Sequence, residues 1–141
     1  MSNAQPVERT LVLLKPDAVA RGLTGQILAR YEAKGLVIVA LKRLLTSRET
    51  AAAHYAEHEG RDYYPTLIDF ITSAPLVALV LESERAIEIV RLLNGSTDSA
   101  KAAPGTIRGD LSVFHNRNLV HASDSAESAA REIGIWFPEE A

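Results

Sequence analysis

The chain has 141 residues and no cysteine, so it contains no disulfide bond. It also lacks any apolar run approaching the roughly 18 to 20 residues that a membrane-spanning helix needs. The segment from Met1 to Glu8 holds no apolar stretch of the length found in signal peptides. We therefore expect a soluble, cytoplasmic protein without a membrane segment.

An excess of charge of one sign is lacking too. The sequence carries 15 Lys and Arg residues against 18 Asp and Glu residues, a formal net charge of −3. Proteins whose main partner is nucleic acid usually show a basic excess or a basic stripe. Nucleic acid is therefore not expected as the primary partner, and any anionic ligand must be bound by a few well-placed cations.

What the sequence does contain is enough apolar material for one core. Apolar residues make up 47% of the chain and charged residues 23%, as in a compact globular domain. No repeat, linker or low-complexity segment divides it. We expect a flexible N-terminal segment over residues 1–8 and a single domain over residues 9–141.

Apolar runs and amphipathic stretches alternate along the chain. The runs predict four strands, at Thr10–Leu14, Leu36–Leu41, Leu76–Leu81 and near Leu119–His121. Helical spacing of apolar residues predicts helices at Gln26–Lys34, Tyr64–Ile71, Ala86–Leu93 and about Ser125–Ile133, and a capping box at Thr46 and Glu49 predicts the start of another. The stretch from Asn94 to Asp110 is rich in turn residues and is expected to be irregular.

This order of elements predicts an α+β fold. It is compatible with a ferredoxin-like βαββαβ sandwich, in which helices cover one face of a four-stranded antiparallel sheet. Enzymes, RNA-binding proteins and regulatory modules share this architecture. The fold alone therefore does not decide the function.

His121 is the first candidate for chemistry. It leaves the apolar run Leu119–Val120 and is followed closely by Ser123–Ser125, residue types that begin helices. A side chain at such an edge is held rigidly while its ring can face a cleft, which suits a nucleophile. Taken by itself, one histidine of four is more often a structural side chain.

Three other patterns indicate sites more weakly. The loop Pro104–Asp110 places Arg108 beside glycines, where backbone and guanidinium can approach a phosphate, although a plain loop is the commoner explanation. His54 and His58 have a spacing that could bind zinc on a helix, but a solvated helix face is expected because no third ligand is evident. Lys15 follows the first strand, where ligand sites gather.

Six segments, taken together, share residues, order and spacing with one known family. They are Leu13–Ala18, Arg21-Gly22, His54-Tyr55, Pro104–Asp110, Asn118–Ser128 and Glu132–Phe137. In this combination the chain resembles the nucleoside diphosphate kinases from about Glu8 to Phe137. The most specific segment is His121-Ala122-Ser123-Asp124-Ser125.

The resemblance implies a ping-pong phosphotransferase with His121 as the carrier. A nucleoside triphosphate would phosphorylate its ring on Nδ1, and a different nucleoside diphosphate would then take up the phosphoryl group. Neutral imidazole is a competent nucleophile near pH 7. The other ring nitrogen needs an acceptor, and the sequence leaves open whether Glu132 or a backbone carbonyl supplies it.

The resemblance also implies roles for residues around this histidine. Tyr55 and Glu132 match residues that support the ring, and Ser123 matches a serine bonded to that glutamate. Lys15 matches a residue close to both the transferred phosphate and the ribose. These four side chains are therefore expected to take part in catalysis with His121.

Nucleotide contacts are implied at a second set of positions. Arg91, Thr97 and Arg108 match phosphate ligands, and Asn118 matches, with Lys15, a ribose contact. Mg²⁺ is expected to arrive with the substrate phosphates, because the sequence shows no dedicated carboxylate cage.

Base recognition is implied to be broad, because the family holds the base by stacking and apolar contact. Tyr63 stands at the position of the aromatic clamp, which is usually Phe, and the opposite wall falls near His115. Both side chains could add a hydrogen bond to the base. That they merely line an open cleft mouth is the favoured interpretation.

A homo-oligomer is also implied, without a choice between tetramer and hexamer. Thr97-Asp98-Ser99 stands where the family often has Thr-Asn-Pro, and the missing proline predicts looser assembly. Ala122 stands where glycine is frequent. As an alternative to a kinase, the fold permits a non-catalytic ferredoxin-like module that binds nucleotide without turnover.

Overall fold

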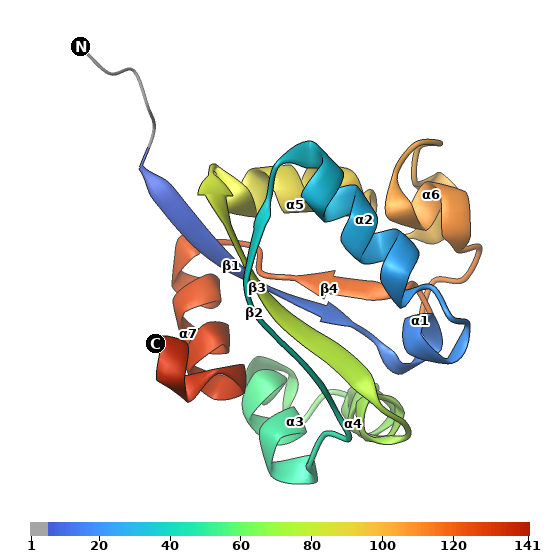
Figure 1. Ribbon diagram of the computed structural model, residues 1–141. Coiled ribbons are helices and arrows are strands. Elements are labelled where there is room, and N and C mark those ends of the chain that lie inside the picture. The colour runs from blue at the N-terminus through green and yellow to red at the C-terminus, as the bar shows by residue number, and fades with distance from the viewer. Residues whose placement is uncertain (1–5) are drawn as a thin grey trace.

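The computed structural model describes residues 6–141, and over this range it contains a four-stranded sheet (Figure 1). Its strands are β1 (Val7–Leu14), β2 (Val37–Leu44), β3 (Leu76–Glu84) and β4 (Val120–Ala122). They lie in the order β2-β3-β1-β4, and every neighbouring pair is antiparallel. The predicted α+β fold with a four-stranded antiparallel sheet is confirmed.

The first strand starts earlier than the sequence predicts. Residues 1–5 of the expected flexible segment lie outside the described residues. Val7 and Glu8 belong to β1, where they pair with Glu84 and Ser83 of β3. The part of β1 that the sequence predicts, Thr10–Leu14, is its fully buried half.

Helices fill most of the remaining chain. The α-helices are α1 (Pro16–Ala20), α2 (Thr24–Lys34), α3 (Arg48–His54), α4 (Tyr64–Thr72), α5 (Ala86–Asn94), α6 (Ile107–Leu111) and α7 (Ala126–Trp136), and the 3₁₀ helices are η1 (Ala56–His58), η2 (Ser99–Lys101) and η3 (Pro138–Glu140). The sequence predicts neither α1 nor α6. Each has five residues, too few for a helical period to appear in the sequence.

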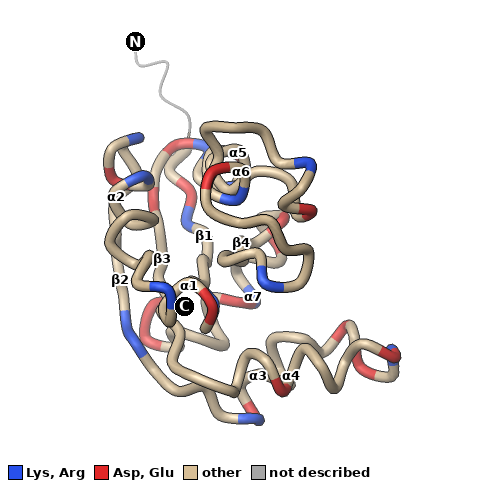
Figure 2. The backbone as a smooth tube through the Cα atoms, turned by 90° about the vertical axis from the view of Figure 1, so that its right-hand side faces the viewer, with Lys and Arg blue, Asp and Glu red and all other residues tan. Residues whose placement is uncertain are grey.

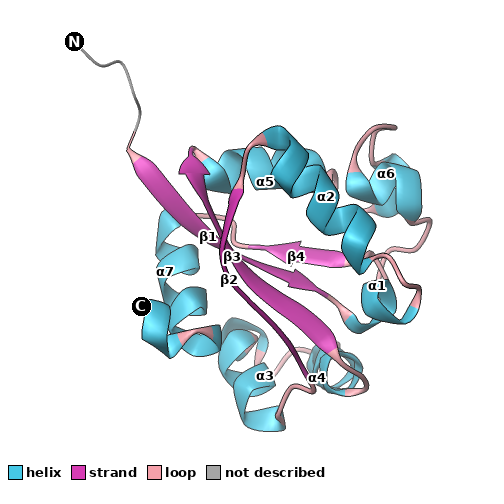
Figure 3. Cartoon of the chain, viewed as in Figure 1, coloured by secondary structure: helices cyan, strands magenta, loops and turns pink. Residues whose placement is uncertain are grey.

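Helices cover both faces of the sheet, as Figure 3 shows, and the expectation of helices on one face is wrong. Side chains alternate along β1, so Val12 and Leu14 join a core with α2 and α5. Leu11 and Leu13 join a second core with α3, α4 and α7. Burial from both sides fixes β1 firmly, and β4 pairs with it.

The start of α3 also differs from the prediction. Ser47, and not Thr46, is the N-cap, and its Oγ accepts a hydrogen bond from the Thr50 backbone N–H at 3.1 Å. Thr46 is buried instead. The helix that Ser47 opens ends at His54, so this cap helps to set where His54 lies.

Acidic and basic positions are interspersed over the described chain, without a continuous basic stripe (Figure 2). Some are paired across elements, such as Arg30 with Asp110 at 2.9 Å. No helix among residues 6–141 has both the length and the apolar composition to cross a membrane.

Candidate active site

Strand β4 places His121 at the edge of the sheet. His121 pairs with Leu13 of β1, so the two side chains lie on the same face. That face carries the core formed with α3, α4 and α7. The His121 ring therefore lies between the end of α3 and the middle of α7, and its side chain keeps 26% of its surface exposed.

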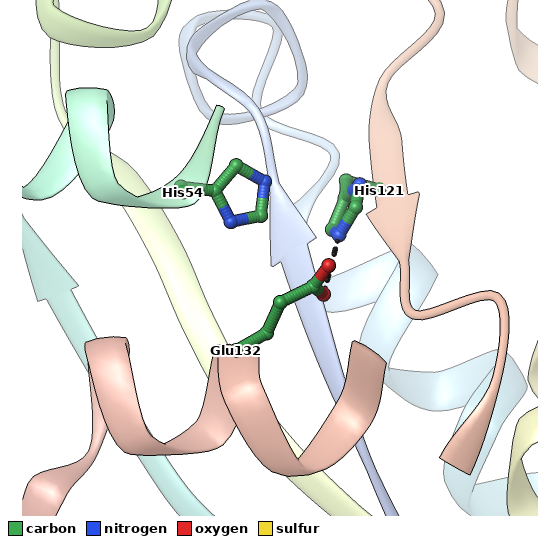
Figure 4. A group of neighbouring side chains, drawn as sticks. All are labelled: His54, His121 and Glu132. Carbon is green, nitrogen blue, oxygen red and sulfur yellow. Dashed lines mark hydrogen bonds and ion pairs between the residues drawn. The ribbon is translucent and has the colours of Figure 1, made fainter. Parts of the chain in front are cut away.

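One carboxylate holds the His121 ring. Glu132, on α7, has its Oε1 2.8 Å from Nε2 of His121 (Figure 4). Ser123 Oγ donates to the same oxygen at 2.8 Å. Because a carboxylate oxygen accepts, Nε2 carries the proton and Nδ1 keeps its lone pair. The sequence leaves open whether Glu132 or a backbone carbonyl accepts from this nitrogen. In the structure the acceptor is Glu132.

The polar contacts around Glu132 are themselves buried. Glu132 is 5% exposed and Ser123 is fully buried at the end of β4. The Ser123 backbone N–H also donates to the Leu11 carbonyl at 3.1 Å, which continues the β1–β4 pairing past Ala122. The side chain that orients His121 is thus fixed by α7 on one side and by the sheet on the other.

His54 lies against His121, a position that sequence reasoning missed. It is the last residue of α3 and only 3% exposed, and its ring centroid is 4.5 Å from that of His121. His58 lies in η1, outside α3. The expected solvated helix face with both histidines is therefore wrong. Burial of His54 depends on the packing of α3 against α7, which a local sequence pattern does not reveal.

Tyr55 follows His54 and borders the same space. Burial, and then the Glu132 carboxylate, raise the pKa of Tyr55 to about 12. Its phenol therefore remains protonated and can donate a hydrogen bond at neutral pH.

A strained residue precedes the histidine strand. Leu119 has φ 76°, the left-handed region that side chains rarely adopt, at a cost of roughly 1 to 3 kcal/mol. Asp17 accepts its N–H at 3.0 Å, and its carbonyl accepts from the Lys15 backbone N–H at 2.8 Å. The Lys-Pro-Asp segment after β1 thus holds the turn that leads into His121, a role for Asp17 that the sequence did not indicate.

Lys15 reaches the site from the end of β1. Its Nζ donates to Asn118 Oδ1 at 2.5 Å, and Asn118 Nδ2 donates to the Thr97 carbonyl at 2.8 Å. Burial, with a further contribution from Arg108, lowers the pKa of Lys15 to about 8, although Asp17 opposes this shift. The ammonium group is poorly solvated, which favours binding of an anion.

Arg108 connects α6 to the loops around the histidine. Its guanidinium donates to the carbonyls of Asn118 at 3.1 Å, Gly95 at 2.8 Å and Val120 at 2.6 Å. Three of its five N–H groups are therefore used, and two remain for a ligand. Burial lowers the pKa of Arg108, yet an arginine stays charged at neutral pH.

These groups border one cleft of about 570 Å³, within the range of small-molecule sites. Its lining includes nearly all residues that the resemblance selects, namely Lys15, Tyr55, Arg91, Thr97, Arg108, Asn118, His121 and Glu132. Ser123 lies behind Glu132, away from the lining. Three cations and a histidine with a free Nδ1 thus face one cavity, an arrangement suited to binding and attacking a phosphate.

The residues expected at the base do not line this cleft. Tyr63 is 48% exposed, and its hydroxyl lies 2.8 Å from Nδ1 of His58, which does border the cleft. His115 is exposed on the loop before β4. His58 therefore competes with a bound base for the hydrogen bond of the Tyr63 hydroxyl.

The glycines of the Pro104–Asp110 loop differ in role from the expectation. A Cβ on Gly109 would stand 2.0 Å from the Ala103 carbonyl oxygen, so the absence of a side chain permits close packing within the loop. Gly105 has φ 96° and its N–H donates to Asp110 at 2.8 Å. Arg108 borders the cleft, whereas neither glycine does.

The side chains also indicate which metal the cleft could hold. Among residues 6–141, His54, His121 and Glu132 form a group that could hold a metal ion. Each offers one ligand atom, and these atoms lie within 4.8 Å of one another. Mg²⁺ takes oxygen ligands in a nearly octahedral arrangement. Two imidazoles and one carboxylate do not fit Mg²⁺, so the protein offers no cage of its own for this ion at the histidine.

Comparison with known protein families identifies the same enzyme class as the resemblance. The family described as "Nucleoside diphosphate kinase" matches residues 8–141. A nucleoside diphosphate kinase of Nocardioides is 65% identical over 130 residues, covering 92% of this chain and 96% of the relative. One from the archaeon Archaeoglobus fulgidus is 53% identical over 134 residues, covering 95% and 89%.

Solved structures agree with these relatives. A halophilic nucleoside diphosphate kinase from Halobacterium salinarum, in complex with CDP, has a TM-score of 0.92 and 45% identity, covering 96% of this chain and 90% of its own. A nucleoside diphosphate kinase family protein from Babesia bovis has a TM-score of 0.92 and 47% identity, covering 94% and 90%. With a family match over nearly its whole length, this chain belongs to the nucleoside diphosphate kinase family, whose members are phosphotransferases.

Proposed function

We propose that this protein transfers the γ-phosphoryl group of a nucleoside triphosphate to a nucleoside diphosphate through a phosphohistidine on His121. The Nδ1 lone pair attacks the γ-phosphorus, a P–N bond forms, and the bond to the β–γ bridging oxygen breaks. The nucleoside diphosphate leaves with that electron pair. A different diphosphate then attacks the same phosphorus through its terminal oxygen, and the P–N electrons return to Nδ1.

The observation that carries this proposal is the hydrogen bond between Nε2 of His121 and Glu132. It leaves Nδ1 as the nucleophile, and the carboxylate stabilises the positive charge that develops on the ring during attack. No proton has to move in either half-reaction. Ser123 acts indirectly, by fixing Glu132, and Tyr55 is a protonated donor that borders the same cleft as His121.

The cations of the cleft bind the phosphates. Lys15, Arg91 and Arg108 line the same cleft as His121, and their charges would stabilise the negative charge that spreads over the equatorial oxygens in the transition state. A hydrogen bond to a charged group contributes roughly 1.5 to 3 kcal/mol. Asn118 and Thr97 complete the polar lining, with Asn118 as a contact to the ribose and Thr97 as a contact to phosphate.

Mg²⁺ enters as part of the nucleotide substrate. The substrate phosphates and water would supply its oxygen ligands, since the imidazole-rich group at His121 does not suit it. When bound with the nucleotide, the ion would neutralise part of the phosphate charge, alongside Lys15, Arg91 and Arg108 of the cleft.

Base selection is proposed to be broad. Tyr63 offers a half-exposed aromatic face for stacking, which every base can use. The complex of the Halobacterium salinarum relative with CDP supports acceptance of a pyrimidine nucleotide. We further propose that the protein works in the cytoplasm as a homo-oligomer.

Labelling tests the function directly. Incubated with Mg²⁺ and γ-labelled ATP, the protein should acquire acid-labile, base-stable label, and an unlabelled diphosphate such as GDP should remove it. His121→Ala should abolish labelling, whereas His115→Ala, at an exposed histidine outside the cleft, should not. Nucleotide binding without label would favour the non-catalytic module, and equal labelling of His121→Ala would contradict the assignment of the carrier.

A further inference from the structure

His54 borders the cleft, yet the phosphoryl transfer described above gives it no task. Its side chain is 3% exposed, and its ring stands edge-on to His121 with an interplanar angle of 80°. A polar side chain buried so deeply beside a nucleophile requires partners for both of its ring nitrogens.

Trp136 determines which nitrogen of His54 carries the proton. The indole Nε1–H can only donate, and it lies 3.1 Å from Nδ1 of His54, so Nδ1 holds a lone pair. Burial is the main cause that lowers the pKa of His54 to about 2, and electrostatic contributions from the neighbouring His121, Arg131 and His58 act in the same direction. The ring is therefore neutral, and its single proton resides on Nε2.

The Nε2–H group of His54 is open to the cleft. Among residues 6–141 no side chain or carbonyl accepts this proton, and Nε2 is not one of the fully buried atoms without a partner. Figure 4 shows one ring nitrogen of His54 on the side that faces His121. The cleft is thus bordered by a lone pair from His121 and a proton from His54, on rings whose centroids are 4.5 Å apart.

A metal ion is a poor occupant of this position. A metal-bound histidine donates its second ring N–H to an acceptor. Here the second nitrogen, Nδ1, faces the Trp136 donor, so binding through Nε2 would require a ring without any proton. An anionic oxygen fits the Nε2–H donor without such a change.

We propose that His54 donates a hydrogen bond from Nε2–H to an oxygen of the phosphoryl group as that group moves onto and off Nδ1 of His121. The inference rests on the proposed function, because the acceptor exists only while a phosphoryl group is at His121. Since burial keeps the ring neutral, this donor is present at neutral pH.

Variants in a Trp136→Phe background test the donor, because substituting His54 alone would leave the buried Trp136 indole N–H without its acceptor. In that background, His54→Phe retains the ring and lacks the donor. His54→Gln lacks the ring and retains an amide N–H. The measurements are the single-turnover rate of label capture from γ-labelled ATP and the dissociation constant for ADP, which lacks the transferred group.

Relative to the background, His54→Phe should slow label capture by about 10-fold to 100-fold, the effect of one hydrogen bond to a charged group. His54→Gln should stay within about 3-fold because a donor remains. ADP affinity should be unchanged in both. An unchanged rate in His54→Phe, an equal loss in both variants, or a parallel loss of ADP affinity would overturn the role of His54 as donor.

The unsubstituted protein provides a second test, which does not depend on the folding of variants. With ¹⁵N-labelled histidine, Nδ1 of His54 should resonate as an unprotonated nitrogen, and its Nε2–H proton should move downfield when His121 is phosphorylated. A protonated Nδ1, or an unmoved Nε2–H signal, contradicts the proposal. Failure of the unsubstituted protein to take up label at all would instead contradict the proposed function.

Discussion

Two neighbouring histidines have opposite tasks because their partners differ. His121 gives its N–H to the Glu132 carboxylate and keeps a lone pair for the cleft. His54 receives an N–H from Trp136 and keeps a proton for the cleft. At the residue scale, the task of each histidine thus depends on which ring nitrogen is hydrogen-bonded within the protein and which one is left to contact the ligand.

The sequence could predict part of this arrangement. Resemblance selected His121, Glu132 and Ser123, and the structure places them within hydrogen-bonding distance. The sequence could not predict the burial of His54, because that burial results from the packing of α3 against α7, which are far apart in the sequence. Asp17 belongs to the matched segment Leu13–Ala18, but the sequence does not indicate its role as an acceptor, because that role depends on the backbone of Leu119.

Lys15 should give the reaction a basic limit. The pKa of about 8 means that the free protein loses the ammonium charge as pH rises through that value, whereas the unfolded chain keeps it up to 10.5. The profile of kcat/KM, which reports the free enzyme, should therefore fall above about pH 8. The kcat/KM of Lys15→Gln should be lower than that of the unsubstituted protein and should not fall above about pH 8.

The same shift predicts the pH dependence of stability. Between about pH 8 and 10.5 the unfolded chain binds more protons at Lys15 than the folded protein, so Lys15 makes the free energy of unfolding rise with pH over this window. Lys15→Gln should lose that contribution in urea titrations. If the variant retains both the fall in kcat/KM and the rise in stability, another group is responsible.

At the scale of elements, the long periodic helices were predictable and the five-residue helices were not. Four of the predicted helices overlap α2, α4, α5 and α7. The short helices α1 and α6 depend instead on end contacts, such as Thr106 Oγ accepting from the Gly109 N–H at 3.0 Å. Both carry or adjoin site residues, so the irregular parts of the sequence contribute much of the cleft.

The 3₁₀ helix η2 offers a test of the missing proline. Ser99 is its first residue, where proline fits, and Asp98 before it has the extended conformation that a following proline requires. The Ser99 hydroxyl is also buried without a partner among the described residues. Ser99→Pro should raise the free energy of unfolding by about 0.5 to 1 kcal/mol.

Lys101→Pro is the matched control for that substitution. Its backbone N–H donates to the Asp98 carbonyl at 3.0 Å, so proline at this position should destabilise the protein. Thermal unfolding of both variants measures the difference. A destabilising Ser99→Pro would show that the η2 backbone does not tolerate proline. The absence of proline at residue 99 would then not explain a less stable loop.

At the scale of the whole molecule, the run Leu11–Leu14 already contained the signal for a sheet covered on both faces. Four consecutive apolar residues cannot all face one core in a strand. A strand with such a run is buried on both faces, so helices on one face alone would leave half of these side chains exposed. The two cores found in the structure explain why β1 is fully buried over this stretch.

The apolar surface along β2 predicts self-association. Val37 is 56% exposed, Leu41 45% and Leu45, just after the strand, 65%, and β2 is an edge strand. Exposed edges with apolar side chains favour pairing with another chain. Light scattering over a dilution series should give a multiple of the 15.3 kDa chain mass.

Leu41→Glu should shift that mass toward the monomer at low concentration. Leu92→Glu, the same change on exposed α5, serves as the control and should leave the mass unaltered. A monomer at all concentrations for the unsubstituted chain would contradict the homo-oligomer. Equal weakening by both substitutions would show that β2 has no special part in assembly.

The central claim is that Glu132 holds Nε2 of His121 and thereby reserves Nδ1 for the phosphoryl group. Identification of the phosphohistidine isomer after labelling with γ-labelled ATP tests this most directly. Alkaline hydrolysis and chromatography against the two authentic isomers should yield the Nδ1 isomer. Recovery of the Nε2 isomer, or of no phosphohistidine, would contradict the account.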